Sequence, residues 1–196
     1  MSRIFQRIIA TLVLLAASFF TCSVASATTP SEPSTGAALT SQMTQLFGAI
    51  TSNSLSEASP LFFPESAYVK MKTGRIASPS TDYANRLYAF YRLDLDAYHQ
   101  AVSTDAHFVG IRLTGTTAGW IPSGVCENSF GYWHLPNVRI IFSENGIQKS
   151  MLVASLISYA GKWYIIHLGP NPRPRNVGMV DSESSGAAPA GPPGGC

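Results

Sequence analysis

Apolar residues recur at helical spacing in two stretches of the first half of the chain. Within residues 37–52 they lie three and four positions apart, which predicts an amphipathic helix. They are Leu39, Met43, Leu46, Phe47 and Ile50. The sequence Ser-Thr-Asp at 80–82 offers N-cap side chains for a second helix over residues 82–103. Its apolar face consists of Leu87, Tyr91, Leu95, Tyr98 and Val102.

The second half of the chain changes to the shorter period of β-strands. Asn145-Gly146 lies between two apolar runs and is typical of a hairpin turn, and Ala160-Gly161 forms a second turn. The expected strands cover residues 108–113, 130–134, 138–142, 149–159 and 163–168. Helices followed by a meander of strands predict an α+β fold, in which the helices pack on one face of a curved antiparallel sheet.

Two-residue turns fix the strand register, pairing Glu144 with Ile147 and Tyr159 with Lys162. One face of the sheet is then apolar apart from Ser155 and should meet the helices. The second face is also too apolar to lie in water, so we expect a second copy of the protein to cover it. The interface residues predicted on this face are Arg139, Leu152, Leu156, Trp163 and His167. Arg139 and His167 could instead form a small polar site there.

Asp94 lies inside the apolar stripe of the second helix, between Leu87 and Phe90 on the helical wheel. A carboxylate that faces the core is costly unless it is paired or protonated. Unpaired in a cavity, Asp94 would have a raised pKa and could act as a general acid or base. Alternatively it pairs with an arginine such as Arg112, or with a tyrosine hydroxyl.

The first 27 residues have the features of a cleavable signal peptide. Arg3 and Arg7 precede an uncharged, mostly apolar run over residues 8–20, and small residues end at Ala27. The run is shorter than the roughly 20 residues that span a bilayer, so a retained membrane anchor is the weaker interpretation. Cys22 raises a lipoprotein alternative, but Phe19 and Phe20 are too large for that processing. We therefore expect export to the periplasm, the cell envelope or the medium.

Charge argues against nucleic acid as a partner. Residues 1–27 hold two of the 13 Lys and Arg residues and none of the 11 acids, so the remainder of the chain is neutral. Without a basic patch, the release of counterions that drives binding to nucleic acid is missing.

Two of the three cysteines, Cys126 and Cys196, lie beyond the predicted signal peptide. In an oxidising compartment they could bridge each other, form intermolecular bridges or remain free thiols. No His and Cys residues have zinc-ligand spacing, and the sequence predicts no metal and no cofactor.

These features divide the chain into four parts. Residues 1–27 are the expected signal peptide, and residues 28–36, rich in Thr, Pro and Ser, form a linker. Residues 37–172 make up one α+β domain. Residues 173–196 are rich in Gly, Pro and Ala and are expected to be a disordered tail.

The element order resembles the nuclear-transport-factor-2-like superfamily, whose cone-shaped fold is related to that of cystatins. The resemblance is carried by residues 155–168, a strand, a tight turn and a closing strand, and by residues 61–69, Leu-Phe-Phe-Pro-Glu-Ser-Ala-Tyr-Val. This second segment is similar to exported bacterial proteins. The superfamily includes small-molecule enzymes, isomerases and non-catalytic binding modules, so the resemblance implies a fold and leaves the function open.

Two functions remain. The first is a non-catalytic exported protein that binds a small apolar molecule or an envelope protein. The second is an isomerase or hydratase that uses Asp94 for proton transfer inside the cone. The residues predicted to line the ligand site are Asp94, Tyr91, Tyr98, Arg112, Tyr132 and Tyr164.

Overall fold

The computed structural model describes residues 29–113 and 117–180. All the helices and strands of the described residues lie within one compact unit, Ser31–Cys196. The elements confirm a mixed α+β fold built on a five-stranded antiparallel sheet. The predicted signal peptide lies outside the described residues.

The helices precede the sheet along the chain. The first helix, α1 (Ala37–Thr51), buries the predicted stripe. The short helices α2 (Leu55–Ala58) and η1 (Ser59–Leu61) lead to α3 (Glu65–Lys72), which the sequence pattern did not reveal. A run of three segments follows without a break: α4 (Pro79–Asp82), the π-helical turn η2 (Tyr83–Leu87) and α5 (Tyr88–Ala101). This run matches the second predicted helix, extended at its start to Pro79, a residue favoured in the first helical turn.

The strands are β1 (His107–Arg112), β2 (Gly119–Ile121), β3 (Tyr132–Glu144), β4 (Ile147–Tyr159) and β5 (Lys162–His167). The short turn η3 (Val125–Glu127) lies between β2 and β3. The order in the sheet is β1-β3-β4-β5, and β2 also pairs with β3. Two of the predicted strands are joined in the single long strand β3. Both predicted turn pairings, Glu144 with Ile147 and Tyr159 with Lys162, are confirmed.

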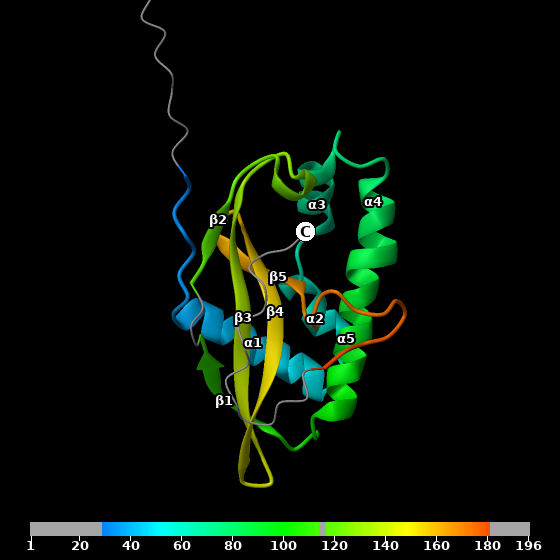
Figure 1. Cartoon of the computed structure of the whole chain (residues 1–196). Helices are drawn as coiled ribbons and strands as arrows, with labels where there is room; N and C mark the ends of the chain where they lie inside the picture. Colours follow the sequence, from blue (N-terminus) through cyan, green and yellow to red (C-terminus); the bar gives the residue numbers. More distant parts are fainter. Residues whose placement is uncertain (1–28, 114–116, 181–196) are drawn as a thin grey trace, which may run out of the picture. The chain divides into compact units, whose positions relative to one another are not determined.

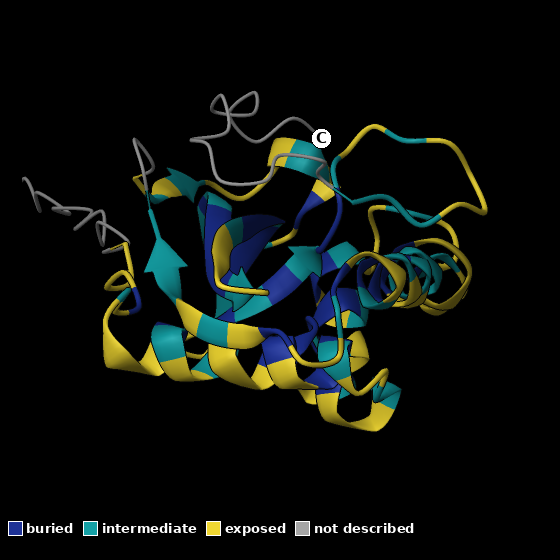
Figure 2. Ribbon diagram, turned by 90° about the horizontal axis from the view of Figure 1, so that it is seen from below, coloured by how far each residue is buried: buried dark blue, intermediate teal, exposed yellow. Residues whose placement is uncertain are grey.

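The core lies between the helices and the sheet, where Figure 2 shows the buried residues. Helix α1 crosses one face of the sheet, and α5 runs beside the sheet (Figure 1). Phe47 of α1 packs on Phe142 of β3, with ring centroids 5.4 Å apart. Phe62, which precedes α3, stacks on Tyr91 of α5 at 4.4 Å. These contacts place the helices on the face of the sheet that carries Phe142, as the register predicted.

Candidate functional site

A pocket of about 620 Å³ lies between the sheet and the helices. The sheet contributes side chains of β2–β5, the helices contribute α3 and η2, and the segment around η3 forms the rim. The sheet residues that line the pocket are Ile121, Tyr132, His134, Ser155, Ile157, Ile166 and His167. The helical residues are Tyr68, Met71, Lys72, Arg86 and Leu87, and the others are Gly124, Cys126, Glu127, Asn128 and Asn171. The lining therefore mixes apolar surface with polar groups.

A β-bulge brings His167 into this pocket. Leu156 pairs with Ile165, but the next residue back, Ser155, pairs with His167, so Ile166 is an extra residue in β5. An inserted residue reverses which side chains share a face beyond it. The prediction that His167 lies on the same face as Arg139 is therefore wrong, because it assumed unbroken alternation after the turn.

His167 joins a second histidine and a serine on the sheet wall. The imidazole Nε2 of His134 lies 2.6 Å from the hydroxyl of Ser155, from one strand to the next. Burial lowers the pKa of His134. Burial also lowers the pKa of His167 to about 4, and the charges of Arg173, Arg86 and His134 act in the same direction. Both imidazoles are therefore neutral at pH 7, and the wall offers neutral hydrogen-bonding groups.

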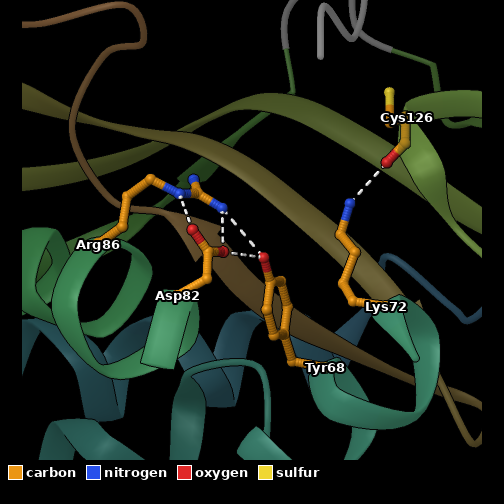
Figure 3. Close-up of polar contacts among 5 residues, drawn as sticks. All are labelled: Tyr68, Lys72, Asp82, Arg86 and Cys126. Carbon is orange, nitrogen blue, oxygen red and sulfur yellow. Dashed lines mark hydrogen bonds and ion pairs between the residues drawn. The ribbon is translucent and has the colours of Figure 1, made fainter. Parts of the chain in front are cut away.

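The opposite wall of the pocket is formed by helices, and it contains an ion pair between two residues that lie one helical turn apart. Arg86 donates through Nε and Nη2 to the two carboxylate oxygens of Asp82, at 2.7 and 2.6 Å. Tyr68 of α3 joins them: its hydroxyl donates to Asp82 and accepts from Arg86 Nη2 at 3.0 Å (Figure 3). The hydrogen bond from Arg86 lowers the pKa of Asp82, and burial is the main cause that raises the pKa of Tyr68. The π-helical turn η2 carries Arg86 and Leu87, and such turns are frequent at functional sites.

Lys72 lies one turn after Tyr68 on α3 and is the second cation of the helical wall. Its ammonium donates to the backbone carbonyl of Cys126, 2.5 Å away, and lies 5.9 Å from the centre of the Tyr68 ring. Burial lowers the pKa of Lys72. Tyr68 thus lies between the two cations of this wall (Figure 3).

Asp94 is fully buried, as predicted, but it lies outside the pocket and has three donors. Arg173 forms an ion pair with it, and the backbone amides of Gly169 and Met179 donate at 2.9 and 3.0 Å. Burial raises the pKa of Asp94, and these bonds oppose the rise. The partner is Arg173 and not Arg112, the example that the sequence suggested.

The segment after β5 differs from the prediction of a disordered tail that begins at residue 173. Residues 169–180 lie against α5 because Arg173 is buried: its side chain is 4% exposed, and its guanidinium stacks 4.2 Å from the ring of Phe90. Gly178 approaches the carbonyl of Leu93 so closely that a Cβ atom would lie 1.9 Å from its oxygen. The domain therefore extends to Val180, and residues 181–196 lie outside the described residues.

The structure does not bring the six predicted ligand residues together, and only Tyr132 of that set lines the pocket. Tyr91 and Tyr98 are buried, and their hydroxyls donate to the backbone carbonyls of Ala58 and Leu152. Arg112 lies at the end of β1, opposite Arg139. The ring of Tyr164 packs against that of Phe63, with the two ring planes at 72°. These side chains are part of the scaffold.

Four of the five predicted interface residues are already buried within a single chain. Leu152, Leu156 and Trp163 are buried, and Arg139 donates to the hydroxyl of Ser150 at 2.9 Å. The indole of Trp163 donates to the backbone carbonyl of Pro33 at 3.1 Å, so the segment before α1 lies against it. These side chains are buried without a second copy of the protein, and the homodimer stays a prediction.

Cys126 is disulfide-bonded, and its backbone has a positive φ of 54°. Cys22 and Cys196 both lie outside the described residues, so the pairing of Cys126 with Cys196 stays a prediction. In residues 29–113 and 117–180, no group of three or more His, Cys, Asp or Glu side chains could hold a metal ion. Over the same ranges, no helix is both long and apolar enough to cross a membrane.

Sequence reasoning missed most of the residues that line the site. Tyr68 and Lys72, and likewise Asp82 and Arg86, are spaced i and i+4 and so share a helical face. The sequence showed this spacing for Asp82 and Arg86, which lie in a predicted helix. It could not show it for Tyr68 and Lys72, because helix α3 was not predicted. His134 and Ser155 come together only through the pairing of β3 with β4.

A comparison of the chain with known protein families, with curated proteins and with solved structures found no match.

Proposed function

We propose that this protein is an exported binding protein with a nuclear-transport-factor-2-like cone, which takes a small organic molecule into the pocket between sheet and helices. The pocket itself supports this proposal. Its volume of about 620 Å³ lies in the range of small-molecule sites, about 300–1,000 Å³. Such sites combine apolar side chains with polar groups that fix the orientation of the ligand, and this lining holds both kinds.

A small molecule suits the site better than an envelope protein. The pocket lies between two walls that face each other, which favours a compact ligand over an extended protein surface. Helices packed on an antiparallel sheet support the cone architecture. Export rests on the sequence of residues 1–27, and N-terminal sequencing of the exported protein would test it by finding Thr28 first.

The alternative, an isomerase or hydratase that uses Asp94, gains no support. A proton-transfer group must reach its substrate within hydrogen-bond distance. The carboxylate of Asp94 is 0% exposed, accepts from Arg173 and two amides, and lies outside the pocket.

The neutral dye N-phenyl-1-naphthylamine tests the proposal, because its fluorescence rises in apolar sites. We expect saturable binding of one dye per chain. Ile121→Trp and Ile166→Trp each place a bulky ring in the lining and should weaken binding about tenfold or more. Both positions are half-buried, so a larger side chain can be accommodated at the pocket edge.

Ile147→Trp is the matched control, because Ile147 is 62% exposed at the tip of the β3–β4 hairpin. This variant should bind the dye as the wild type does. Circular dichroism must show that all three variants are folded. Dye binding that is not saturable, or that survives both pocket substitutions, would refute a ligand site here.

A further inference from the structure

The helical wall of the pocket carries two cations with unused hydrogen-bond donors. Within the described part of the chain, Lys72 donates only to the carbonyl of Cys126, which leaves two of its three N–H groups. Arg86 uses Nε and Nη2 for Asp82 and Tyr68, and its Nη1 makes no hydrogen bond to a described residue. Both side chains line the pocket.

The acids close to these cations do not occupy those donors. Both carboxylate oxygens of Asp82 are taken by Arg86 and by the hydroxyl of Tyr68. Glu127 acts on Lys72 through its charge but is exposed at the rim. An exposed carboxylate is well solvated and screened, so it competes weakly for a half-buried ammonium.

The sheet wall adds no acid to the pocket. Its lining side chains include no Asp or Glu, and the guanidinium groups of Arg173 and Arg86 lower the pKa of His167. Among the described residues, no acid acts on this histidine in the opposite direction. An anion in the pocket would therefore face the two cations of the helical wall and, on the sheet wall, neutral imidazoles instead of acids.

We propose that the ligand of this pocket is an amphiphilic organic anion, whose acidic group binds between Lys72 and Arg86. This inference rests on the proposed function. Its apolar body would lie on Met71, Leu87 and Ile157, which line the same space. A carboxylate, a sulfonate or a phosphate shares the chemistry that an ammonium and a guanidinium recognise.

Two dyes with the same ring skeleton separate this inference from the proposed function. 8-Anilinonaphthalene-1-sulfonate differs from N-phenyl-1-naphthylamine by its sulfonate. Lys72→Met keeps most of the length of the unbranched side chain and removes the charge. We expect it to weaken binding of the sulfonate about tenfold, the value of one charge-assisted hydrogen bond, and to change binding of the neutral dye less than twofold.

Lys70→Met is the matched control, because Lys70 is an exposed lysine of the same helix and does not line the pocket. It should leave the affinities for both dyes unchanged. Arg86→Lys gives a second, independent variant that keeps a charge near Asp82 and removes the guanidinium. It should also weaken binding of the sulfonate dye selectively, whereas Ile121→Trp should weaken binding of both dyes.

Competition identifies the acidic group. Octanoate and octyl phosphate should displace the sulfonate dye, whereas octanol should displace it poorly. The stronger competitor of the two acids shows whether the site prefers a carboxylate or a phosphate. If octanol competes equally well, or if Lys72→Met and Arg86→Lys weaken binding of both dyes alike, binding does not depend on an acidic group of the ligand. The proposed function would then stand without this inference. If neither dye binds saturably, the proposed function itself fails.

Discussion

Asp94 of α5 and Arg173 form a buried ion pair that joins the middle of the helix to the segment after the last strand. The two side chains are 0% and 4% exposed, and 79 positions separate them in the sequence. A charge in such a place requires its partner, because water cannot replace it.

Asp94→Asn should lower the free energy of unfolding by about 3–5 kcal/mol, since it leaves the guanidinium of Arg173 buried without a counter-charge. Chemical denaturation measures this loss. Asp96→Asn is the control: Asp96 is exposed on the same helix, and its substitution should change the stability by less than about 0.5 kcal/mol. Equal stabilities of Asp94→Asn and the wild type would contradict a structural ion pair.

His167 should make the stability depend on pH. The pKa of His167 is about 4 in the folded protein, against about 6.5 in an unfolded chain. Between these values the unfolded state binds a proton that the folded state does not. The free energy of unfolding should therefore fall as the pH drops from about 6.5 to about 4, by about 3 kcal/mol in all. Below pH 4 this histidine adds no further loss.

Urea denaturation between pH 7.5 and 5 measures this dependence, in a range where most carboxylates stay ionised. His167→Gln should flatten the profile, with the smaller contribution of His134 remaining. His107→Gln, at an exposed position of β1, should keep the wild-type slope. Parallel profiles for His167→Gln and the wild type would show that this imidazole is not buried in its neutral form.

Gly178→Ala should loosen the segment 169–180 from α5. A Cβ atom at this position would lie 1.9 Å from the oxygen of Leu93 and 2.7 Å from the Cβ of Ala97, so the backbone must move. Such overpacking costs about 1–3 kcal/mol. Hydrogen exchange of the Met179 amide, which donates to Asp94, should become faster. Gly119→Ala, where the added methyl group meets open space, should leave this exchange unchanged.

Gly48→Ala should stabilise the protein by up to about 1 kcal/mol. Gly48 is exposed within α1, an added Cβ meets nothing within 4 Å, and alanine has the higher helix propensity. Gly146→Ala should have the opposite effect, because the hairpin turn holds this residue at a φ of +74°. Thermal unfolding of both variants gives the two signs, and a destabilised Gly48→Ala would contradict the exposed helical position.

Local patterns were sufficient to predict the two long helices, both hairpin turns and the burial of Asp94. They were not sufficient for the site. The bulge at Ile166 reverses the orientation of His167, and nothing in the alternation of residues 162–168 distinguishes an inserted residue from a regular one. The partner of Asp94 lies in a stretch whose composition predicts a tail. A composition rich in Pro and Gly does not reveal a single long-range charge pair.

The ion pair between Asp94 and Arg173 also has a consequence for synthesis on the ribosome. Helix α5 is complete when Ala101 has been added, but Arg173, the partner of Asp94, follows Asp94 by 79 residues. Until Arg173 has been added, burial of α5 would leave the carboxylate of Asp94 without a counter-charge. This cost keeps that face of α5 in water. Docking of α5 should therefore follow assembly of the sheet, and a nascent chain stalled before Arg173 should expose this helix to proteases and chaperones.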